Sequence, residues 1–497
     1  MLAEALRLTT SQEDIDELTA QLEAELKECE ATTVSYKNKL KQFMMENDIW
    51  QISELNYYWR EKYCEYLKNR MSKTSCELYI KTFDRVKLHS LRKQPQIILA
   101  GKRQRLEYAD EILYLPYHPN IEIAERFCRE NNKNLLAWDF TLIAAEKLKR
   151  QIFQVLHYFI ENAANSERMH AQLGGLARLY DFCILEQIED LEKLEIDQIE
   201  RFQKTFTTEY QRHYYAGVTY WCGRALFMEA EEIHWDANVW YMERMHLQPE
   251  RIDPAAPIMS LSFAEVTNKE NRKLLQKYLR YGIGIANLSI SSLRTEFLVV
   301  RKFLGDMNQP ETENICMVTE QQMDAWLRSE QQREVQADTF NKKVMCILHF
   351  FQYLQIKDYI TAIPFDPNYY LKKTFMQHHD RSVAQETMDQ IRRNLYRFPE
   401  EVRLMYLHLW GVGLRISEVC TLKGNAYYLQ GKDAWIQVYQ IKMRTYKRIP
   451  IPMTLYRLMQ VYITKYKRKT EEYIFQNRNG GAYRKTTFQQ TMKRLCE

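Results

Sequence analysis

The chain has 497 residues, 45% of them hydrophobic and 27% charged, which suits about three folded domains and excludes a disordered protein. It has no run of 18 apolar residues, and its first thirty residues are acidic without an apolar core, so we expect neither a membrane span nor a secretion signal. Its ten cysteines form no Cys-x-x-Cys pair, which argues against a metal site or a disulfide framework and favours the reducing cytoplasm.

Positive charge is concentrated at the C-terminal end. The net charge is +5, yet residues 440–497 hold fourteen Lys or Arg against three Asp or Glu, a difference of +11 that leaves −6 for residues 1–439. A basic segment on an otherwise acidic chain predicts contact with a polyanion at that end. A solvated helical face gives a similar pattern, so charge alone leaves both interpretations open.

The first half of the chain is predicted to be helical, because helix breakers are few and Leu, Glu, Lys, Gln and Arg are many. Residues 1–45 form a long charged helix with a stripe at Leu18, Leu22 and Leu26, either a short coiled coil or a helix packed on the next domain. Residues 46–250 form a helical N-terminal region of one or two parts. We expect its many Trp and Tyr in cores rather than on a platform for nucleobases.

Two segments echo each other. The helices around Leu179–Leu185 and Phe350–Leu354 both end in a short acidic turn. A duplicated helical unit explains this pattern, and so does chance, because all helices obey the same rules at their ends.

A second helical domain is predicted over residues 258–362, after a linker at Arg251–Pro257 that is rich in Pro and Ala. Two stripes at helical spacing lie within Ala286–Met307 and Ala337–Ile360, and Gly305 fits a C-terminal cap. The stripes are Leu293, Phe297, Val300 and Leu304, then Phe340, Val344, Ile347, Phe351 and Leu354. A connector with two prolines follows at Ile363–Tyr370.

Residues 375–497 are predicted to form a mostly helical domain with a small β-hairpin. Gly411–Leu422 reads G-V-G-L-R-I-S-E-V-C-T-L, a turn that opens a helix with Arg415 and Glu418 on one face. Tyr427–Asp433 is predicted to be a turn before a strand at Ala434–Ile441. That strand alternates, with Trp435, Gln437 and Tyr439 on one face and Ile436, Val438 and Ile441 nearly on the other. Lys442–Pro452, K-M-R-T-Y-K-R-I-P-I-P, supplies the second arm.

These segments resemble the catalytic domain of tyrosine recombinases, the phage integrases and their transposon-encoded relatives. The resemblance implies that residues 258–362 are a SAM-like helical core-binding domain that clamps DNA. It implies that Arg415 is the first catalytic arginine, that Lys442 is the lysine on the hairpin, and that Glu418 supports the site. Contacts with DNA are expected at the following residues: Arg444, Lys447, Arg448, Arg294, Arg301 and Lys302.

The chemistry explains why these residue types are needed. Transfer of a phosphodiester to a tyrosine oxygen builds negative charge on phosphate oxygens, which the planar guanidinium of Arg415 can neutralise. Lys442 can protonate the leaving 5′ oxygen as a general acid. The bond energy is kept in a phosphotyrosine link, so the resemblance implies neither a metal nor another cofactor.

The family's pattern continues with a His-x-x-Arg box and a nucleophilic Tyr, and neither follows Lys442 in order. Two His-x-x-Arg strings, at His89 and His378, precede Arg415 and are expected to be surface residues. Tyr473 and Tyr483 also lack the preceding box, which makes them poor nucleophiles. We therefore expect a truncated chain that cannot catalyse strand exchange alone.

Three functions remain open. The first is a site-specific recombinase or integrase of a mobile element, acting on double-stranded DNA in the bacterial cytoplasm and self-associating there, as a tetramer in the family. The second is a DNA-binding module without catalysis, a remnant or regulator. The third is a helical scaffold in which Arg415 and Glu418 form only a structural ion pair. Steep salt dependence of DNA binding would separate the third from the others.

Overall fold

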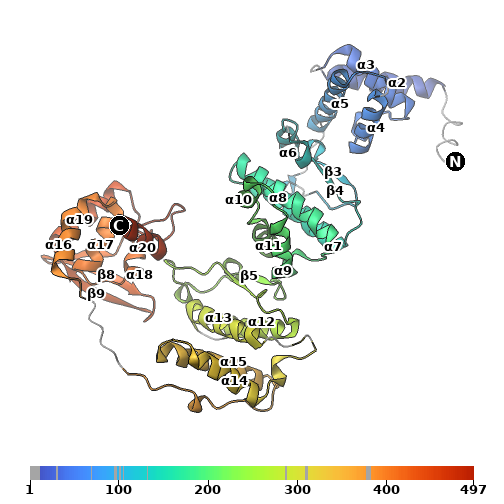
Figure 1. Cartoon of the computed structure of the whole chain (residues 1–497). Helices are drawn as coiled ribbons and strands as arrows, with labels where there is room; N and C mark the ends of the chain where they lie inside the picture. The colour runs from blue at the N-terminus through green and yellow to red at the C-terminus, as the bar shows by residue number, and fades with distance from the viewer. Residues whose placement is uncertain are drawn as a thin grey trace. The chain divides into compact units, whose positions relative to one another are not determined.

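Figure 1 shows the computed structural model of the protein. Two compact units divide the chain after Glu229, residues 1–229 and 230–497, and each is described by itself. Helices dominate both units, and four small antiparallel sheets occur among the described residues, so the expected mainly α fold is confirmed. No helix in the described ranges is long and apolar enough to cross a bilayer. The structure describes residues 12–29, 32–68, 70–93, 98–99, 102–103, 106–130, 132–285, 288–307, 310, 312–375 and 382–496.

The first helices of unit 1 share one apolar cluster. Residues 1–45 do not form the single helix predicted, because α2 (Gln12–Glu28) and α3 (Val34–Glu46) are separate helices. Leu22 of α2 and Phe43 of α3 are buried in the same cluster, so the leucine stripe belongs to a helical core. The remaining elements of this part are η1 (Ile52–Glu54), α4 (Tyr57–Lys68), α5 (Lys73–Lys93), β1 (Ile98–Leu99) and β2 (Lys102–Arg103).

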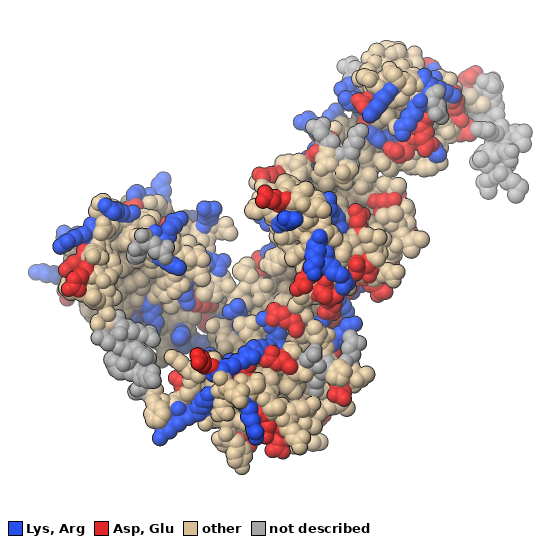
Figure 2. All heavy atoms as spheres, viewed as in Figure 1, with Lys and Arg blue, Asp and Glu red and all other residues tan. Residues whose placement is uncertain are grey.

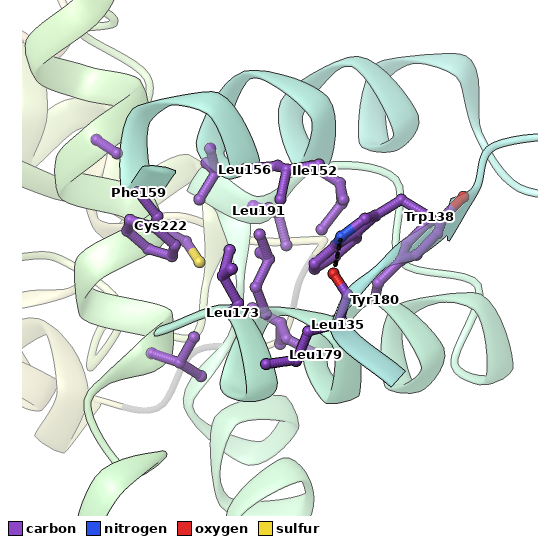
Figure 3. Packing of buried hydrophobic residues seen from close by; sticks show 14 of the residues in the cluster. Leu135, Trp138, Ile152, Leu156, Phe159, Leu173, Leu179, Tyr180, Leu191 and Cys222 are labelled. Atoms are coloured by element: carbon purple, nitrogen blue, oxygen red, sulfur yellow. Dashed lines mark hydrogen bonds between the residues drawn. The ribbon is translucent and has the colours of Figure 1, made fainter. Parts of the chain in front are cut away.

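A second core in unit 1 forms around α7 and α8 (Figure 3). Trp138 is buried there, and its indole N–H donates to the Leu135 carbonyl at 3.2 Å. Tyr180 is also buried, and its hydroxyl donates to the Asp139 carbonyl at 3.1 Å. These aromatic rings are therefore core, as predicted. The elements are β3 (Ile112–Tyr114), η2 (Leu115–Tyr117), α6 (Ile121–Phe127), η3 (Lys133–Leu135), β4 (Ala137–Asp139), α7 (Glu146–Asn162), α8 (Ser166–Leu185), η4 (Leu191–Lys193), α9 (Ile196–Lys204), α10 (Glu209–Tyr214) and α11 (Val218–Glu229).

The first part of unit 2 contains both predicted stripes. All nine of their residues are buried, four on α13 and five on α15. Gly305 is not a cap, because α13 continues past it to Met307. Residues 286 and 287, where the first of these segments was expected to begin, lie outside the described residues. The elements are β5 (Val239–Tyr241), η5 (Met242–Met245), η6 (Pro249–Arg251), β6 (Ser260–Ser262), α12 (Lys269–Gly284), α13 (Ile290–Met307), η7 (Ile315–Met317), α14 (Glu320–Gln332) and α15 (Ala337–Ile356).

Both units contain the same order of elements. The two-stranded sheet β3–β4 is followed by α7, α8, η4 and α9, and the sheet β5–β6 is followed by α12, α13, η7 and α14. In each sheet, the residue after the second strand donates its N–H to the residue before the first. Phe140 donates to the Glu111 carbonyl (3.2 Å) and Phe263 to the Asn238 carbonyl (2.8 Å). The repeat therefore extends to individual backbone hydrogen bonds.

The two units also share a hydrogen bond between a 3-10 turn and the first helix after the sheet, which is η4 with α7 in unit 1 and η7 with α12 in unit 2. The buried Leu191 N–H of η4 donates to Oε1 of Gln151 on α7 at 2.8 Å. The Ile315 N–H of η7 donates to Oδ1 of Asn271 on α12 at 2.7 Å. In both units, an amide side chain of the first helix thus satisfies a backbone donor that would otherwise be buried without a partner.

The similarity in sequence between the segments around Leu179–Leu185 and Phe350–Leu354 does not come from this repeat. The two segments belong to α8 and α15, which occupy different places in the repeated order of elements. Both helices end in the same backbone turn, with Ile188 N–H donating to the Cys183 carbonyl (2.8 Å) and Tyr359 N–H to the Leu354 carbonyl (2.9 Å). This is a common helix ending, so the similarity of those two segments is chance.

Residues 251–257 pack against the protein and are not the free linker that their composition predicts. The Arg251 side chain is buried, and its guanidinium donates to the carbonyls of Ile283 (2.7 Å), in the last turn of α12, and of Leu288 (2.9 Å), beyond its end. Ala255 is buried in the cluster formed mainly by residues 402–488, and its carbonyl accepts the Lys485 N–H at 3.0 Å. This segment therefore packs against both parts of unit 2.

The last part of unit 2 combines helices with a three-stranded sheet of order β7-β8-β9. Ile436 and Val438 of β8 are buried and Trp435, Gln437 and Tyr439 only partly so, which confirms the predicted alternation. The turn before β8 is shorter than expected: Tyr427–Gln430 is a strand, and Gly431 turns the chain with a φ of +61°. The elements are η8 (Pro367–Tyr369), α16 (Gln385–Asn394), η9 (Leu395–Arg397), α17 (Glu400–Gly411), α18 (Ile416–Cys420), β7 (Tyr427–Gln430), β8 (Asp433–Gln440), β9 (Thr445–Ile451), α19 (Met453–Lys465) and α20 (Lys485–Cys496).

Candidate active site

Arg415 and Glu418 form a hydrogen-bonded pair at the start of α18. Gly413, with a φ of +71°, turns the chain after α17, and Arg415 occupies the N-cap position rather than the helix itself. Glu418 accepts the Arg415 backbone N–H at 2.8 Å and its Nη1 at 3.0 Å. The Arg415 side chain is 66% exposed and that of Glu418 only 3%. A buried carboxylate thus holds a guanidinium that faces solvent.

Glu418 has two more partners, both on the hairpin of β8 and β9. Gln440 Nε2 donates to Oε1 at 3.1 Å, and Lys447 Nζ lies 3.0 Å from Oε2. Burial alone would raise the pKa of Glu418. Hydrogen bonds from the Arg415 backbone, Lys447, Gln440 and the Arg415 side chain outweigh burial and hold that pKa below its ordinary value. The carboxylate is therefore ionised at neutral pH and joins α18 to the hairpin.

Lys442 lies at the tip of this hairpin, in the turn between β8 and β9. Its side chain is exposed, and the structure gives it no hydrogen bond or ion pair with another described residue. Arg444 in the same turn is exposed and has a φ of +53°. Burial, and then the charge of Arg444, lower the pKa of Arg251. The turn therefore presents positive charge close to the packed segment around Arg251.

Lys447 and Arg448, both predicted to contact DNA, point to opposite faces of β9. Lys447 pairs with Val438 and lies on the buried face of the sheet, where it meets Glu418. Arg448 pairs with Gln437 on the other face, is exposed, and donates its Nε to Gln437 Oε1 at 3.2 Å. The alternation of a strand contains this distinction, so the sequence could have separated the two residues.

The three basic residues predicted on α13 also differ. Arg294 is exposed. The Arg301 side chain is 16% exposed, donates to the Ser262 carbonyl at 3.0 Å and pairs with Glu265 at 2.8 Å. Lys302 pairs with Asp306 and lies 3.3 Å from Glu330. Arg301 and Lys302 are thus held by the protein itself, and Arg294 is better placed to meet a ligand.

A cleft of about 510 Å³ lies beside Glu418. Tyr439 and Tyr446, paired across β8 and β9 with ring centroids 5.0 Å apart, line it together with Tyr473. Pro249 of η6 and Pro254 of the packed segment also line it. Sequence reasoning missed this cleft because residues 251–257 were assigned to a linker.

The residues set aside as nucleophile or box candidates are not gathered at one place: Tyr473 lines the cleft beside Glu418, whereas Tyr483 and His89 belong to other parts of the structure. Tyr483 is buried, and burial raises its pKa, which disfavours the phenolate. His89 is half-buried rather than a surface residue, and its Nε2 is buried without a hydrogen-bond partner. Arg92, which completes that string, pairs with Glu125 at 2.8 Å. The second string, His378 to Arg381, lies outside the described residues.

His408 forms a buried hydrogen-bond chain behind the site. Its Nδ1 lies 2.7 Å from the Leu404 carbonyl, so Nδ1 carries the proton, and Nε2 accepts the Tyr427 hydroxyl at 2.6 Å. Burial lowers the pKa of His408 to about 4, against a smaller opposing effect of the Leu404 hydrogen bond. His408 is therefore a neutral structural residue that links α17 to β7.

This pKa predicts that unit 2 loses stability in mild acid. Between about pH 6.5, the ordinary pKa of His, and about pH 4, only the unfolded chain binds the proton, so stability falls as pH falls. The full effect is about 3 kcal/mol, since each pKa unit is worth about 1.4 kcal/mol. Urea unfolding at pH 7, 5.5 and 4.5 measures it. His408→Asn should remove most of this dependence; an equal dependence in that variant would refute the assignment.

Similarity to known proteins agrees with this geometry. Residues 381–497 match the phage integrase family. This segment is a tyrosine recombinase domain. The recombinase domain contains Arg415, Glu418 and Lys442, and Figure 2 shows more Lys and Arg than Asp and Glu over its visible face. Transposase B from transposon PsiTn554 of Staphylococcus aureus is 22% identical over 278 residues, which cover 54% of this chain and 43% of that protein. Transposase B from Tn554 of S. aureus strain Mu50 gives the same figures.

Solved structures with low similarity include two DNA complexes. The XerH site-specific recombinase bound to difH is 14% identical, with a TM-score of 0.34, over 46% of this chain and 69% of that chain. The Tn1549 transposon integrase with circular intermediate DNA is 15% identical, also with a TM-score of 0.34, over 45% of this chain and 77% of that chain.

Proposed function

We propose that this protein is a site-specific recombinase or integrase of a mobile element and that it binds double-stranded DNA in the cytoplasm. The observation that supports this most directly is the exposed Arg415, held on the buried Glu418, inside a recombinase domain. A guanidinium anchored in this way can meet a phosphate without losing further side-chain freedom. The exposed Lys442 on the adjoining hairpin supplies a second positive group.

In the proposed reaction a tyrosine oxygen attacks the phosphorus of a DNA strand, and the bond from phosphorus to the 5′ oxygen breaks. Arg415 neutralises charge on the non-bridging oxygens as it develops. Lys442 gives its proton to the leaving 5′ oxygen. The new phosphotyrosine ester is later attacked by another 5′ hydroxyl, which restores the diester. No net bond energy is lost, so no nucleotide cofactor is consumed.

The curated relatives are longer than the matched region, so activity of the whole protein is part of the proposal. Within these 497 residues no His-x-x-Arg string follows Lys442. We propose that these residues alone bind DNA without forming a covalent product, and that copies self-associate on DNA. The alternative is a DNA-binding regulator without catalytic activity. The lack of a His-x-x-Arg string after Lys442 within these residues supports that alternative as well.

An electrophoretic mobility shift with DNA from the ends of the encoding element tests the proposal. We expect a shifted complex that dissociates completely on denaturation, because no covalent bond joins the protein to the DNA. Arg415→Ala should weaken binding only several-fold, because one phosphate contact is lost among several. Absence of any complex at low salt would contradict DNA binding, and the helical-scaffold interpretation would then be preferred.

A further inference from the structure

We propose that Lys447 is a positioning residue that acts through Glu418 to hold the Lys442 turn beside Arg415, and that it is not a DNA contact. This inference rests on the proposed function, because Lys442 and Arg415 are its reactive groups. Lys447 was expected among the phosphate-binding residues. Its Nζ instead lies 3.0 Å from a carboxylate whose side chain is 3% exposed, and its own side chain is 26% exposed.

The geometry makes Glu418 the junction between two elements. On one side the carboxylate accepts the backbone N–H and Nη1 of Arg415, both at the start of α18. On the other side it meets Gln440, the last residue of β8, and Lys447 on β9. Both arms of the hairpin are therefore attached to the carboxylate that orients the arginine.

The attachment points lie next to the turn that contains Lys442. Gln440 immediately precedes this turn, and it pairs with Thr445 immediately after it. Lys447 lies two residues further along β9, on the same face of the sheet. The Gln440 carbonyl also accepts the N–H groups of Met443 (3.1 Å) and Arg444 (2.8 Å), so the position of the turn follows that of the strand end. Lys447 contributes the charged part of that attachment.

Charge explains why a lysine suits this position. The ionised Glu418 is buried with one guanidinium donor, one amide and one backbone N–H, and Lys447 adds a second full positive charge. A buried carboxylate needs such partners to offset its lost hydration. Replacement of Lys447 by Met keeps the aliphatic stem but removes this charge, so the hairpin should detach while the strand still packs.

Limited trypsin digestion followed by mass spectrometry tests the proposal in the full chain. We expect cleavage after Lys442 and Arg444 to be roughly tenfold faster in Lys447→Met, since the charged hydrogen bond that attaches β9 to Glu418 is lost. Cleavage in unit 1 should be unchanged. Lys447→Arg, which can still pair with Glu418, should restore the slow rate. Equal cleavage rates in wild type and Lys447→Met would overturn the proposal.

DNA provides the readout that distinguishes positioning from simple structural support. At DNA concentrations that saturate both proteins, the Lys442 turn should be protected from trypsin in wild type and stay cleavable in Lys447→Met. The salt dependence of DNA binding should be the same in both, whereas loss of a direct phosphate contact would lower the slope by about 0.9. A lower slope with unchanged cleavage would make Lys447 a DNA contact.

Arg448→Met is the matched control, because Arg448 is adjacent in sequence and faces the other side of the sheet. It should leave trypsin cleavage after Lys442 at the wild-type rate; faster cleavage there would show that any loss of charge on β9 frees the turn, which contradicts a specific role for Lys447. If the wild-type chain binds no DNA, the proposed function fails, and the DNA-free digestion still decides whether Lys447 holds the turn.

Discussion

Replacement of Glu418 by Leu is expected to destabilise unit 2 by about 3 kcal/mol, the lower end of the range for removing one partner of a buried ion pair. Leu fits the space but leaves Arg415, Gln440 and Lys447 without their acceptor. Lys447 then loses its ion pair with Glu418, and Gln440 loses its hydrogen bond to the same carboxylate. Urea unfolding of the full chain, with the transition of unit 2 followed by hydrogen exchange, measures the loss.

Two further variants separate the contribution of the Glu418 charge from that of its burial. Glu418→Gln keeps an oxygen acceptor and should lose less stability than Glu418→Leu. Glu471→Gln is the control, since Glu471 lines the same cleft and pairs with Lys423 at 3.0 Å, yet its side chain is 75% exposed. We expect at most about 0.5 kcal/mol there, because exposed ion pairs contribute little. Equal losses for Glu418→Leu and Glu471→Gln would show that burial of Glu418 does not matter.

The sequence predicted the parts of this site that depend on local pattern. Arg415 and Glu418 are three residues apart, and a helix start with that spacing brings them together whatever surrounds them. The alternation in β8 likewise located Ile436 and Val438 in the core. The stripes on α13 and α15 were found for the same reason. Periodicity is a property of a few turns or one strand, so it can be read without tertiary structure.

The sequence did not predict features that depend on distant partners. Arg251–Pro257 has the composition of a linker, but Arg251 donates to backbone carbonyls more than thirty residues away, and Ala255 is buried in the apolar cluster of the recombinase domain. Arg301 was predicted to contact phosphate from its charge and position, but its partners in the structure are Glu265 and the Ser262 carbonyl, which the sequence pattern does not indicate. The repeated order of elements in the two units was not predicted either, because the equivalent hydrogen bonds use Gln151 in one unit and Asn271 in the other.

DNA affinity is expected to fall roughly 40-fold between 50 and 200 mM salt. Each neutralised phosphate contributes about −0.9 to the slope of log affinity against log salt, and about three exposed cations give a slope near −2.7. The three are Arg415, Arg448 and Arg294. Fluorescence anisotropy on a short duplex measures this slope, and a slope near zero would contradict phosphate binding at this surface.

Changes in this slope in paired variants test which basic side chains are free to reach a phosphate. Arg294 and Arg301 lie two turns apart on α13, but only Arg301 is held by Glu265 and a backbone carbonyl. Arg294→Gln should therefore reduce the steepness of the slope by about 0.9 and Arg301→Gln by much less. The same contrast is expected between Arg448→Met and Lys447→Met on β9. Equal changes within either pair would mean that DNA rearranges these side chains on binding, and that the ion pairs of the free protein do not decide which cations meet phosphate.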